Sequence, residues 1–294
     1  MTTATPRDLP SSTTLSFTAK RFFHRLKRNP VAILCLCVIA ILAGSAVVSP
    51  WLPIGSPQDI DPVNGYLPPS LDYPFGTDQL GRDMLGMVIH GGRVSLYVGF
   101  TAALVETLIG ITLGLAAGYR GGALDGILVR ISEIVMTFPN LILIMVLVGI
   151  LGPGVNTLVI VFALTGWMTT FRIVRGEVQS IKEETYIDVA RAFGFPTWKI
   201  LIRQILPNAM SPILVAFTIN VAVFILAEAG LSILGLGVPQ TTPTWGNLLS
   251  AAQNVDVMRS YWWIWTAPGI VLAAFVLAIY FLGDTLRDLV DTRS

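Results

Sequence analysis

Residues 31–48 read VAILCLCVIAILAGSAVV and contain no charged side chain. About 20 apolar residues of α-helix cross a hydrocarbon core about 30 Å thick, so this run predicts a membrane span. The segment before it, residues 20–28, is basic and reads KRFFHRLKR. Because the apolar run is as long as a span and shows no convincing small-residue cleavage site, we interpret it as a retained anchor rather than a signal peptide.

The composition of the whole chain also indicates a membrane protein. Of its 294 residues, 53% are hydrophobic and 13% are charged, whereas an ordinary soluble domain carries about 25% charged residues. A soluble chain of this length needs a charged surface, and this sequence has too little charge to build one. The net charge of +1 gives no argument for nucleic acid as a partner. Membrane lipid is the expected surrounding.

Apolar runs long enough to cross a bilayer occur at six places along the chain. They cover residues 31–48, 94–117, 127–151, 157–174, 209–234 and 263–282. Cys35 and Cys37 lie two positions apart in the first run, so on a helix they point to nearly opposite sides and cannot bridge each other. The sequence therefore predicts an all-α integral membrane protein with six transmembrane helices, the first extending over residues 31–52.

The distribution of Lys and Arg predicts the orientation, because cytoplasmic loops carry the excess of these residues. With the N-terminus inside, sixteen of the 19 Lys and Arg residues fall on the inner side. Both termini are therefore expected in the cytoplasm, as a basic tail over residues 1–30 and a short tail over residues 285–294. Residues 53–93 then form an external loop.

The external loop contains a segment with helical spacing. Thr77 or Asp78 is placed to cap a short helix whose apolar face is formed by Leu80, Met84 and Val88. We expect this helix to lie along the membrane surface before the second span. Near the second external loop, we interpret Trp262 and Trp263 as anchors at the membrane–water boundary.

The inner stretch at residues 180–199 reads SIKEETYIDVARAFGFPTWK. Ser180 and Glu183 have the spacing of a capping box, and Gly194 can end the helix that follows. The apolar face of this helix combines Tyr186, Val189, Ala190 and Phe193. A short amphipathic helix can lie on lipid or enter a groove on a soluble partner. Its mixed charges and small residues favour docking to a protein.

This stretch resembles the cytoplasmic EAA loop of the permeases of ATP-binding-cassette importers. Residues 188–190, Gly194 and the Leu206-Pro207 pair follow the spacing of that loop. Aspartate replaces the usual glutamate at position 188, and Val189 replaces the first alanine. The acidic start and the glycine turn are retained.

Five further segments are similar to the C-type permease of dipeptide, oligopeptide and nickel importers. They read FGTDQLGRD at 75–83, GGRVSL at 91–96, LGLGVP at 234–239, PTWG at 243–246 and GDTLRD at 283–288. The resemblance covers nearly the whole chain beyond residue 20. It implies a type I importer permease fold with a five-helix core over residues 94–284 and a coupling loop over residues 180–207.

The resemblance also implies a function and partners. The chain would form half of a path for peptides through the bacterial cytoplasmic (inner) membrane, with a second permease, two ABC ATPase subunits and an external solute-binding protein. ATP and Mg would belong to the ATPases, and this chain would hold no cofactor. The residues implied in ATPase coupling are Tyr186, Ile187, Asp188, Val189, Ala190, Arg191, Ala192, Gly194, Leu206 and Pro207.

The sequence shows no recognisable catalytic or metal-binding motif, which favours a chain that is not an enzyme. The sequence contains no Gly-x-x-x-x-Gly-Lys-Ser/Thr phosphate loop. Its two histidines, His24 and His90, have no second histidine at ligand spacing, so we predict no metal site.

Ionisable residues inside spans are costly and are candidates for function. Glu106 and Glu228 lie in predicted spans, and Asn220 and Phe224 share a helical face with Glu228. We interpret these four residues as lining the path or the contact with the second permease. Glu133 lies one turn from Arg130, which favours a structural ion pair.

Several alternatives remain open from the sequence. Nickel chelates or glutathione-like compounds are possible cargoes of the same importer type. An ion-coupled secondary carrier would show internal repeats and broken helices near the midplane, and we find no repeat. A membrane enzyme would need an acid–base pair, a nucleophile or a metal cluster at membrane depth.

Overall fold

The computed structural model describes residues 29–290, and all the regular secondary structure in this range is helical apart from one isolated bridge between Thr77 and Asp83. The predicted tail segments 1–28 and 291–294 lie outside the described residues. The elements are α2 (Pro30–Val48), η1 (Ser49–Trp51), η2 (Pro62–Asn64), α3 (Met84–Arg120), α4 (Gly122–Met136), α5 (Asn140–Leu151), α6 (Val155–Ile181), α7 (Thr185–Ala192), α8 (Thr197–Ile200), η3 (Leu201–Ile205), α9 (Leu206–Ile233), α10 (Trp245–Leu249), η4 (Ser250–Gln253), α11 (Val255–Ser260) and α12 (Trp263–Val290).

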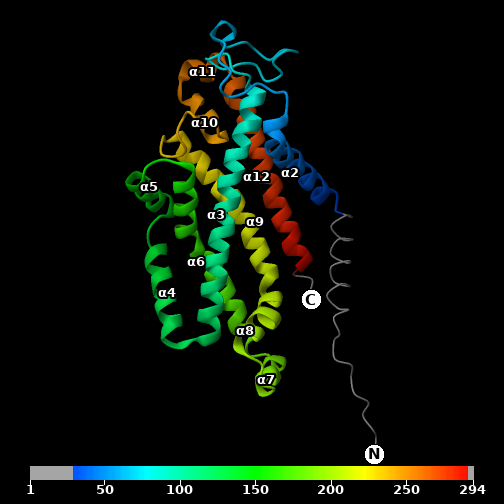
Figure 1. The fold of residues 1–294 in the computed structure, drawn as a ribbon, viewed down its shortest axis with the longest axis vertical. Helices are drawn as coiled ribbons and strands as arrows, with labels where there is room; N and C mark the ends of the chain where they lie inside the picture. Colours follow the sequence, from blue (N-terminus) through cyan, green and yellow to red (C-terminus); the bar gives the residue numbers. More distant parts are fainter. Residues whose placement is uncertain (1–28, 291–294) are drawn as a thin grey trace, which may run out of the picture.

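The long helices form one bundle, with α7 at one end and α10 and α11 at the other (Figure 1). Within the described range, five helical segments are long and apolar enough to cross a membrane, and a bent pair, α4 with α5, forms a sixth candidate. The prediction of an all-helical membrane protein is therefore confirmed. α12 continues to Val290, beyond the end of the predicted core at residue 284.

The third predicted span, residues 127–151, is not one straight helix. The chain bends by 87° between α4 and α5. Pro139 adopts extended backbone angles of φ −57° and ψ 120° at the start of α5, and a residue before proline is disfavoured in the helical region. The expectation of a continuous span is wrong because apolar composition alone does not reveal the break.

The centre of the bundle is the contact between α3 and α6, which is more extensive than any other helix pair among the described residues. Three glycines of α3 lie four residues apart on the face toward α6. A Cβ atom on Gly110, Gly114 or Gly118 would lie 2.6–2.8 Å from the Cβ atoms of Thr170, Val174 and Val178. Small residues at this spacing allow two membrane helices to approach closely.

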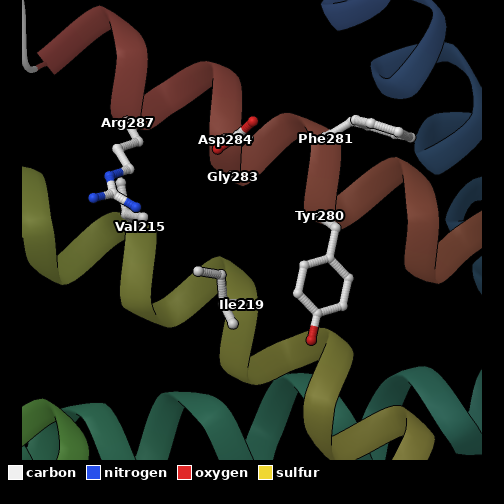
Figure 2. A pocket seen from close by; sticks show the side chains of 7 residues that line it. All are labelled: Val215, Ile219, Tyr280, Phe281, Gly283, Asp284 and Arg287. Carbon is white, nitrogen blue, oxygen red and sulfur yellow. The ribbon is translucent and has the colours of Figure 1, made fainter.

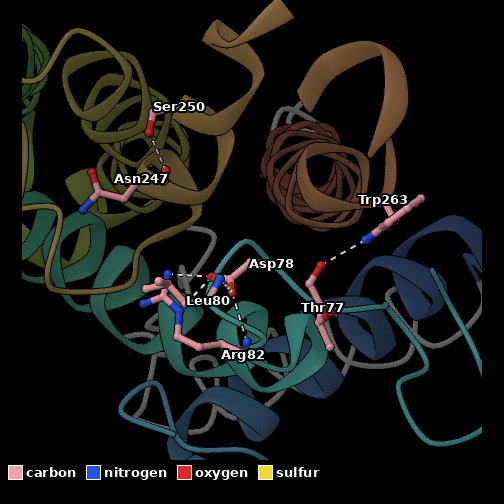
Figure 3. A network of polar contacts seen from close by, with 7 residues as sticks. All are labelled: Thr77, Asp78, Leu80, Arg82, Asn247, Ser250 and Trp263. Carbon is pink, nitrogen blue, oxygen red and sulfur yellow. Dashed lines mark hydrogen bonds and ion pairs between the residues drawn. The ribbon is translucent and has the colours of Figure 1, made fainter. Parts of the chain in front are cut away.

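The segment before α3 differs from the predicted interfacial helix. The N-cap of α3 is Asp83, whose carboxylate accepts hydrogen bonds from Leu85 N (3.0 Å) and Gly86 N (3.3 Å). Residues 77–83 instead form a turn around Asp78, which accepts from Leu80 N and pairs with Arg82 at 2.6 Å (Figure 3). Asp78 organises a turn and caps no helix, so the predicted cap is wrong.

Trp263 fixes this turn to the start of α12. Its indole Nε1 donates a hydrogen bond of 3.1 Å to the carbonyl oxygen of Thr77, and its side chain is 7% exposed (Figure 3). The interpretation of Trp263 as a membrane anchor is therefore wrong. Trp262, which is 54% exposed, remains available for that role.

Candidate coupling site

The local sequence determines where α7 starts and stops. α6 extends to Ile181, so the predicted capping box at Ser180 and Glu183 is wrong, and α7 begins only after Glu184. At the other end Gly194 adopts φ +75°. Its N–H donates to the Arg191 carbonyl (2.9 Å), and Phe195 N–H donates to the Ala190 carbonyl (3.1 Å). These are the two hydrogen bonds of a Schellman motif, and Gly194 ends the helix as the sequence predicts.

After this turn the chain re-enters the bundle through α8 and the π-helical turn η3. Pro196 precedes α8, and Leu206 begins α9 with Pro207 in its first turn. The helical backbone is continuous from α8 through η3 into α9, and Pro207 follows the π-helical turn, where the regular ladder of α-helical hydrogen bonds is already interrupted.

One face of α7 is buried against the bundle. Ile187 is 0% and Ala190 is 4% exposed, and both belong to an apolar cluster with Val174 and Val178 of α6 and Ala209 of α9. This cluster attaches α7 to the two helices that flank it in sequence. Ile187 and Ala190, which the sequence places with the docking residues, are therefore anchors within the chain.

The adjacent face of α7 carries exposed apolar side chains. Tyr186 is 45%, Val189 is 49% and Phe193 is 79% exposed. Large exposed apolar side chains grouped on one face indicate a contact surface. We call Tyr186, Val189 and Phe193 the outer face of α7.

Polar contacts fix α7 to α3 as well. Arg191 donates from Nη1 to Asp188 Oδ1 (3.1 Å) and from Nε to the Tyr119 hydroxyl (3.3 Å), with its guanidinium 5.2 Å from the centre of the Tyr119 ring. The hydrogen bond to Tyr119, together with the nearby Asp188 carboxylate, raises the pKa of Arg191. The Asn208 side chain of α9 donates to the Tyr186 hydroxyl at 3.3 Å. α7 is thus attached to three long helices.

The sequence does not reveal the pair formed by Arg175 and Asp125. Arg175 Nη2 donates to Asp125 Oδ2 at 2.6 Å, which joins α6 to the first turn of α4. The two residues are 50 positions apart, so no local pattern relates them. By contrast, the predicted pair of Arg130 and Glu133 is confirmed at 3.4 Å, although both side chains are exposed.

Glu106 lies inside the bundle with no exposed surface. Its carboxylate accepts hydrogen bonds from Asn220 Nδ2 (2.6 Å) and from the hydroxyls of Thr107 (2.9 Å) and Thr170 (3.1 Å). Because these donors come from α3, α6 and α9, Glu106 joins three helices. Phe224 is also buried and stacks on Phe162 at 5.2 Å.

Glu228 forms a second buried junction nearer the end of the bundle that carries α10 and α11 (Figure 1). It accepts from Ser95 Oγ of α3 (2.9 Å) and from Ser232 Oγ of α9 (2.8 Å), and it has no exposed surface. Ser95 Oγ in turn accepts from Trp245 N of α10 at 3.1 Å. In this conformation Glu106, Phe224 and Glu228 face neighbouring helices of the same chain rather than an open path.

The junction around Glu228 continues into residues that sequence reasoning did not select. Trp245, 2% exposed, donates from its indole to the Val88 carbonyl at 3.0 Å. The Asn247 side-chain amide donates to the Thr242 carbonyl at 2.9 Å, and the backbone carbonyl of Asn247 accepts from Ser250 Oγ (Figure 3). The PTWG segment at 243–246 was the available signal for this junction.

A cleft of about 240 Å³ lies between α9 and α12 (Figure 2). Val215 and Ile219 of α9 form one wall, and Tyr280 and Arg287 of α12 form the other. The lining is mainly apolar and contains no histidine, cysteine or serine. Across residues 29–290, no group of three or more His, Cys, Asp or Glu residues is arranged to hold a metal ion.

Comparisons with known proteins agree with this arrangement. The family description "Binding-protein-dependent transport system inner membrane component" matches residues 110–294, and "N-terminal TM domain of oligopeptide transport permease C" matches residues 16–69. The dipeptide transport system permease protein DppC of Bacillus subtilis (strain 168) is 37% identical over 95% of this chain and 87% of its own length. A putative peptide permease protein of Brucella suis biovar 1 (strain 1330) is 38% identical over 93% of this chain and 91% of its own length.

A solved structure shares the fold at low sequence identity. A chain of the MetNI methionine ABC transporter, in inward-facing conformations, superposes with a TM-score of 0.54 over 70% of this chain and 97% of that chain, at 18% identity. The family matches cover both the N-terminal span and the bundle that holds α7, and the relatives match almost from end to end. This chain therefore belongs to the family of inner-membrane components of binding-protein-dependent transport systems, as a non-catalytic permease.

Proposed function

We propose that this chain forms half of a peptide import path and that its outer face of α7 docks into a groove on an ABC ATPase. The observation that carries this proposal is the two-sided environment of α7. Ile187 and Ala190 are buried against the bundle, whereas Val189 and Phe193 on the adjacent face are exposed. A helix fixed to the bundle in this way can transmit a movement of its partner to the membrane helices.

The remaining partners follow from the same proposal. A second permease completes the path, two ATPase subunits bind at the cytoplasmic end and an external solute-binding protein delivers the cargo. ATP and Mg bind to the ATPases. The exposed apolar surface of α4 and α5, which includes Ile131 and Val146, is available for lipid or for the second permease.

Peptides are the cargo that the relatives support. The names of the Bacillus and Brucella relatives refer to dipeptide or peptide transport. Nickel chelates and glutathione-like compounds are the alternative cargoes. Identification by mass spectrometry of the compound retained by the solute-binding protein, followed by uptake of that compound in proteoliposomes, tests the cargo. Retention of a nickel chelate rather than a peptide would overturn the peptide assignment.

Photo-crosslinking tests the docking. A benzoylphenylalanine residue at position 189 or 193 is expected to crosslink to an ATPase subunit in the assembled complex. The same residue at Leu71, which is fully exposed in the external loop, is the control and is expected to give no ATPase adduct. Equal adducts at the outer face of α7 and at Leu71, or none at the outer face, would contradict the docking.

Family membership argues against the other classes of protein that the sequence left open. An ion-coupled carrier would transport cargo on an ion gradient without an ATPase, and a membrane enzyme would convert a substrate without partners. Uptake by the reconstituted complex should therefore require ATP. Uptake by the isolated chain on an ion gradient would overturn the proposed function.

A further inference from the structure

The break between α4 and α5 is encoded by four consecutive residues, Thr137-Phe138-Pro139-Asn140. Pro139 has no N–H to donate and restricts Phe138 to extended conformations. Thr137 Oγ1 donates to the Glu133 carbonyl at 2.9 Å, a contact that bends helices. The bend of 87° is thus a property of the local sequence.

Helix lengths place this break inside the membrane. α4 has 15 residues and is therefore about 22 Å long at about 1.5 Å per residue. It begins at Gly122, two residues after Arg120, the last residue of α3. α5, with 12 residues, is about 18 Å long. Since a hydrocarbon core is about 30 Å thick, neither helix crosses it alone, and their junction lies at membrane depth.

The junction leaves polar groups without partners. Among residues 29–290, no hydrogen bond reaches the N–H groups of Asn140, Leu141 and Ile142, and no side chain caps α5. The Asn140 side chain is exposed and likewise makes no hydrogen bond within this range. The rest of α5 reads LILIMVLVGIL and is apolar. The unpaired groups are therefore concentrated at its start.

Backbone groups that are not paired internally are not exposed to lipid. At membrane depth they occur only where they are buried in protein or line a water-filled cavity. A neighbouring membrane helix has already paired its own backbone, so it could offer only side chains to three adjacent N–H groups. Water molecules can accept hydrogen bonds from all three N–H groups.

We propose that residues 137–140 line the water-filled path between this chain and the second permease, with Thr137 and Asn140 facing the water. This inference rests on the proposed function, because it assigns a part of the import path to a segment of this chain. Broken helices near the midplane line the substrate path in several classes of transporter. The path-lining segment is therefore the break between α4 and α5, and the buried Glu106 and Glu228 hold the helices around it.

Thiol labelling of the assembled complex in proteoliposomes tests this inference. Replacing Cys35 and Cys37, the two native cysteines, by alanine gives a parent version of this chain that has no thiols, and the label is quantified on this chain after the subunits are separated. Single Thr137→Cys and Asn140→Cys variants are then treated with a charged, membrane-impermeant methanethiosulfonate. Val146→Cys is the matched control, because Val146 is 54% exposed on the body of α5 and lies outside the break.

Thiols react as thiolates and so need water. We expect the cysteines at 137 and 140 to react at least tenfold faster than the cysteine at 146. Reaction at the same slow rate at all three positions would mean that lipid or the second permease covers the break, and it would overturn the inference. Uptake of peptide by the parent is measured separately. Fast labelling of the cysteines at 137 and 140 without peptide uptake would contradict the cargo assignment but would still support the path-lining role of the break.

Discussion

Asn220 Nδ2 donates a hydrogen bond of 2.6 Å to Glu106 Oε1, and this contact joins α9 to α3 around a carboxylate with no exposed surface. Asn220→Ala removes one of the donors and leaves a buried acceptor less satisfied. We expect the variant to lose about 1–3 kcal/mol of stability. Thermal unfolding of the detergent-solubilised complex measures this loss.

The control for Asn220 lies on the same helix. Leu226 is 43% exposed on α9, so Leu226→Ala removes little buried surface and should change the unfolding temperature less. If Asn220→Ala unfolds at the temperature of the Leu226 variant, the amide does not support the Glu106 junction.

Gly194→Val should uncouple ATP hydrolysis from uptake. A Cβ atom at Gly194 would meet nothing within 4 Å, but φ +75° is unfavourable for any side chain. Leaving that conformation would disrupt the Schellman turn that ends α7. We expect less peptide taken up per ATP hydrolysed, with insertion into the membrane intact.

Gly176→Val is the matched variant for this prediction. Gly176 also has open space around its Cβ position, but it lies in α6 without a positive φ. Its coupling ratio should stay near that of the wild type. Equal ratios in the two valine variants would show that the backbone conformation of Gly194 is not required.

The two faces of α7 should respond differently to truncation. Phe193→Ala removes an exposed ring and should weaken ATPase binding without lowering stability. Ile187→Ala removes a buried side chain and should destabilise the chain by about 2–5 kcal/mol. Pull-down of the ATPase and thermal unfolding separate the two effects, and a destabilised Phe193 variant with normal ATPase binding would contradict the assignment of the faces.

Because α3 packs closely on α6, two glycine-to-alanine substitutions should change the stability of the protein in opposite directions. In Gly114→Ala the new methyl group would lie 2.7 Å from Val174 Cβ and 3.0 Å from the Phe171 carbonyl oxygen, so the helices must separate. Gly230 of α9 has open space, and Gly230→Ala should stabilise its helix by up to about 1 kcal/mol. Unfolding temperatures that shift in the same direction would argue against the glycine contact.

Sequence patterns predicted the membrane spans well because an apolar run of about 20 residues is long enough to cross the hydrocarbon core of a bilayer as a helix. Residues 31–48 correspond to α2, and residues 209–234 correspond closely to α9. The pattern failed at residues 127–151, where apolar character continues through a sharp bend. Pro139 was the signal for that bend, and the hydrophobicity of its neighbours obscured it.

The coupling site was predictable as a contiguous segment but not as two faces. Its helical spacing and Gly194 are local properties, and both appear in the sequence. The burial of Ile187 depends on Val174 and Ala209, which come from helices before and after α7. The predicted capping box failed for a related reason, since packing of Val178 on Gly118 favours continuation of α6.

The buried carboxylates show the limit of single-residue reasoning. Glu106 and Glu228 were selected correctly as unusual, because an ionisable residue in a span is costly. Their donors on other helices lie 64, 114 and 133 positions away in the chain, at Thr170, Asn220 and Ser95. No sequence spacing relates such residues, so an interhelical junction could not be distinguished from a path-facing edge.

The 37 residues of α3 form one unbroken helix, about 55 Å long. Its first turn is capped by Asp83 beside the external turn, and its last turn presents Tyr119 to Arg191 of α7. α3 thus contacts both the region expected to bind the solute-binding protein and the region expected to bind the ATPase. Mutations at either end should therefore be assayed at the opposite side of the membrane as well as locally.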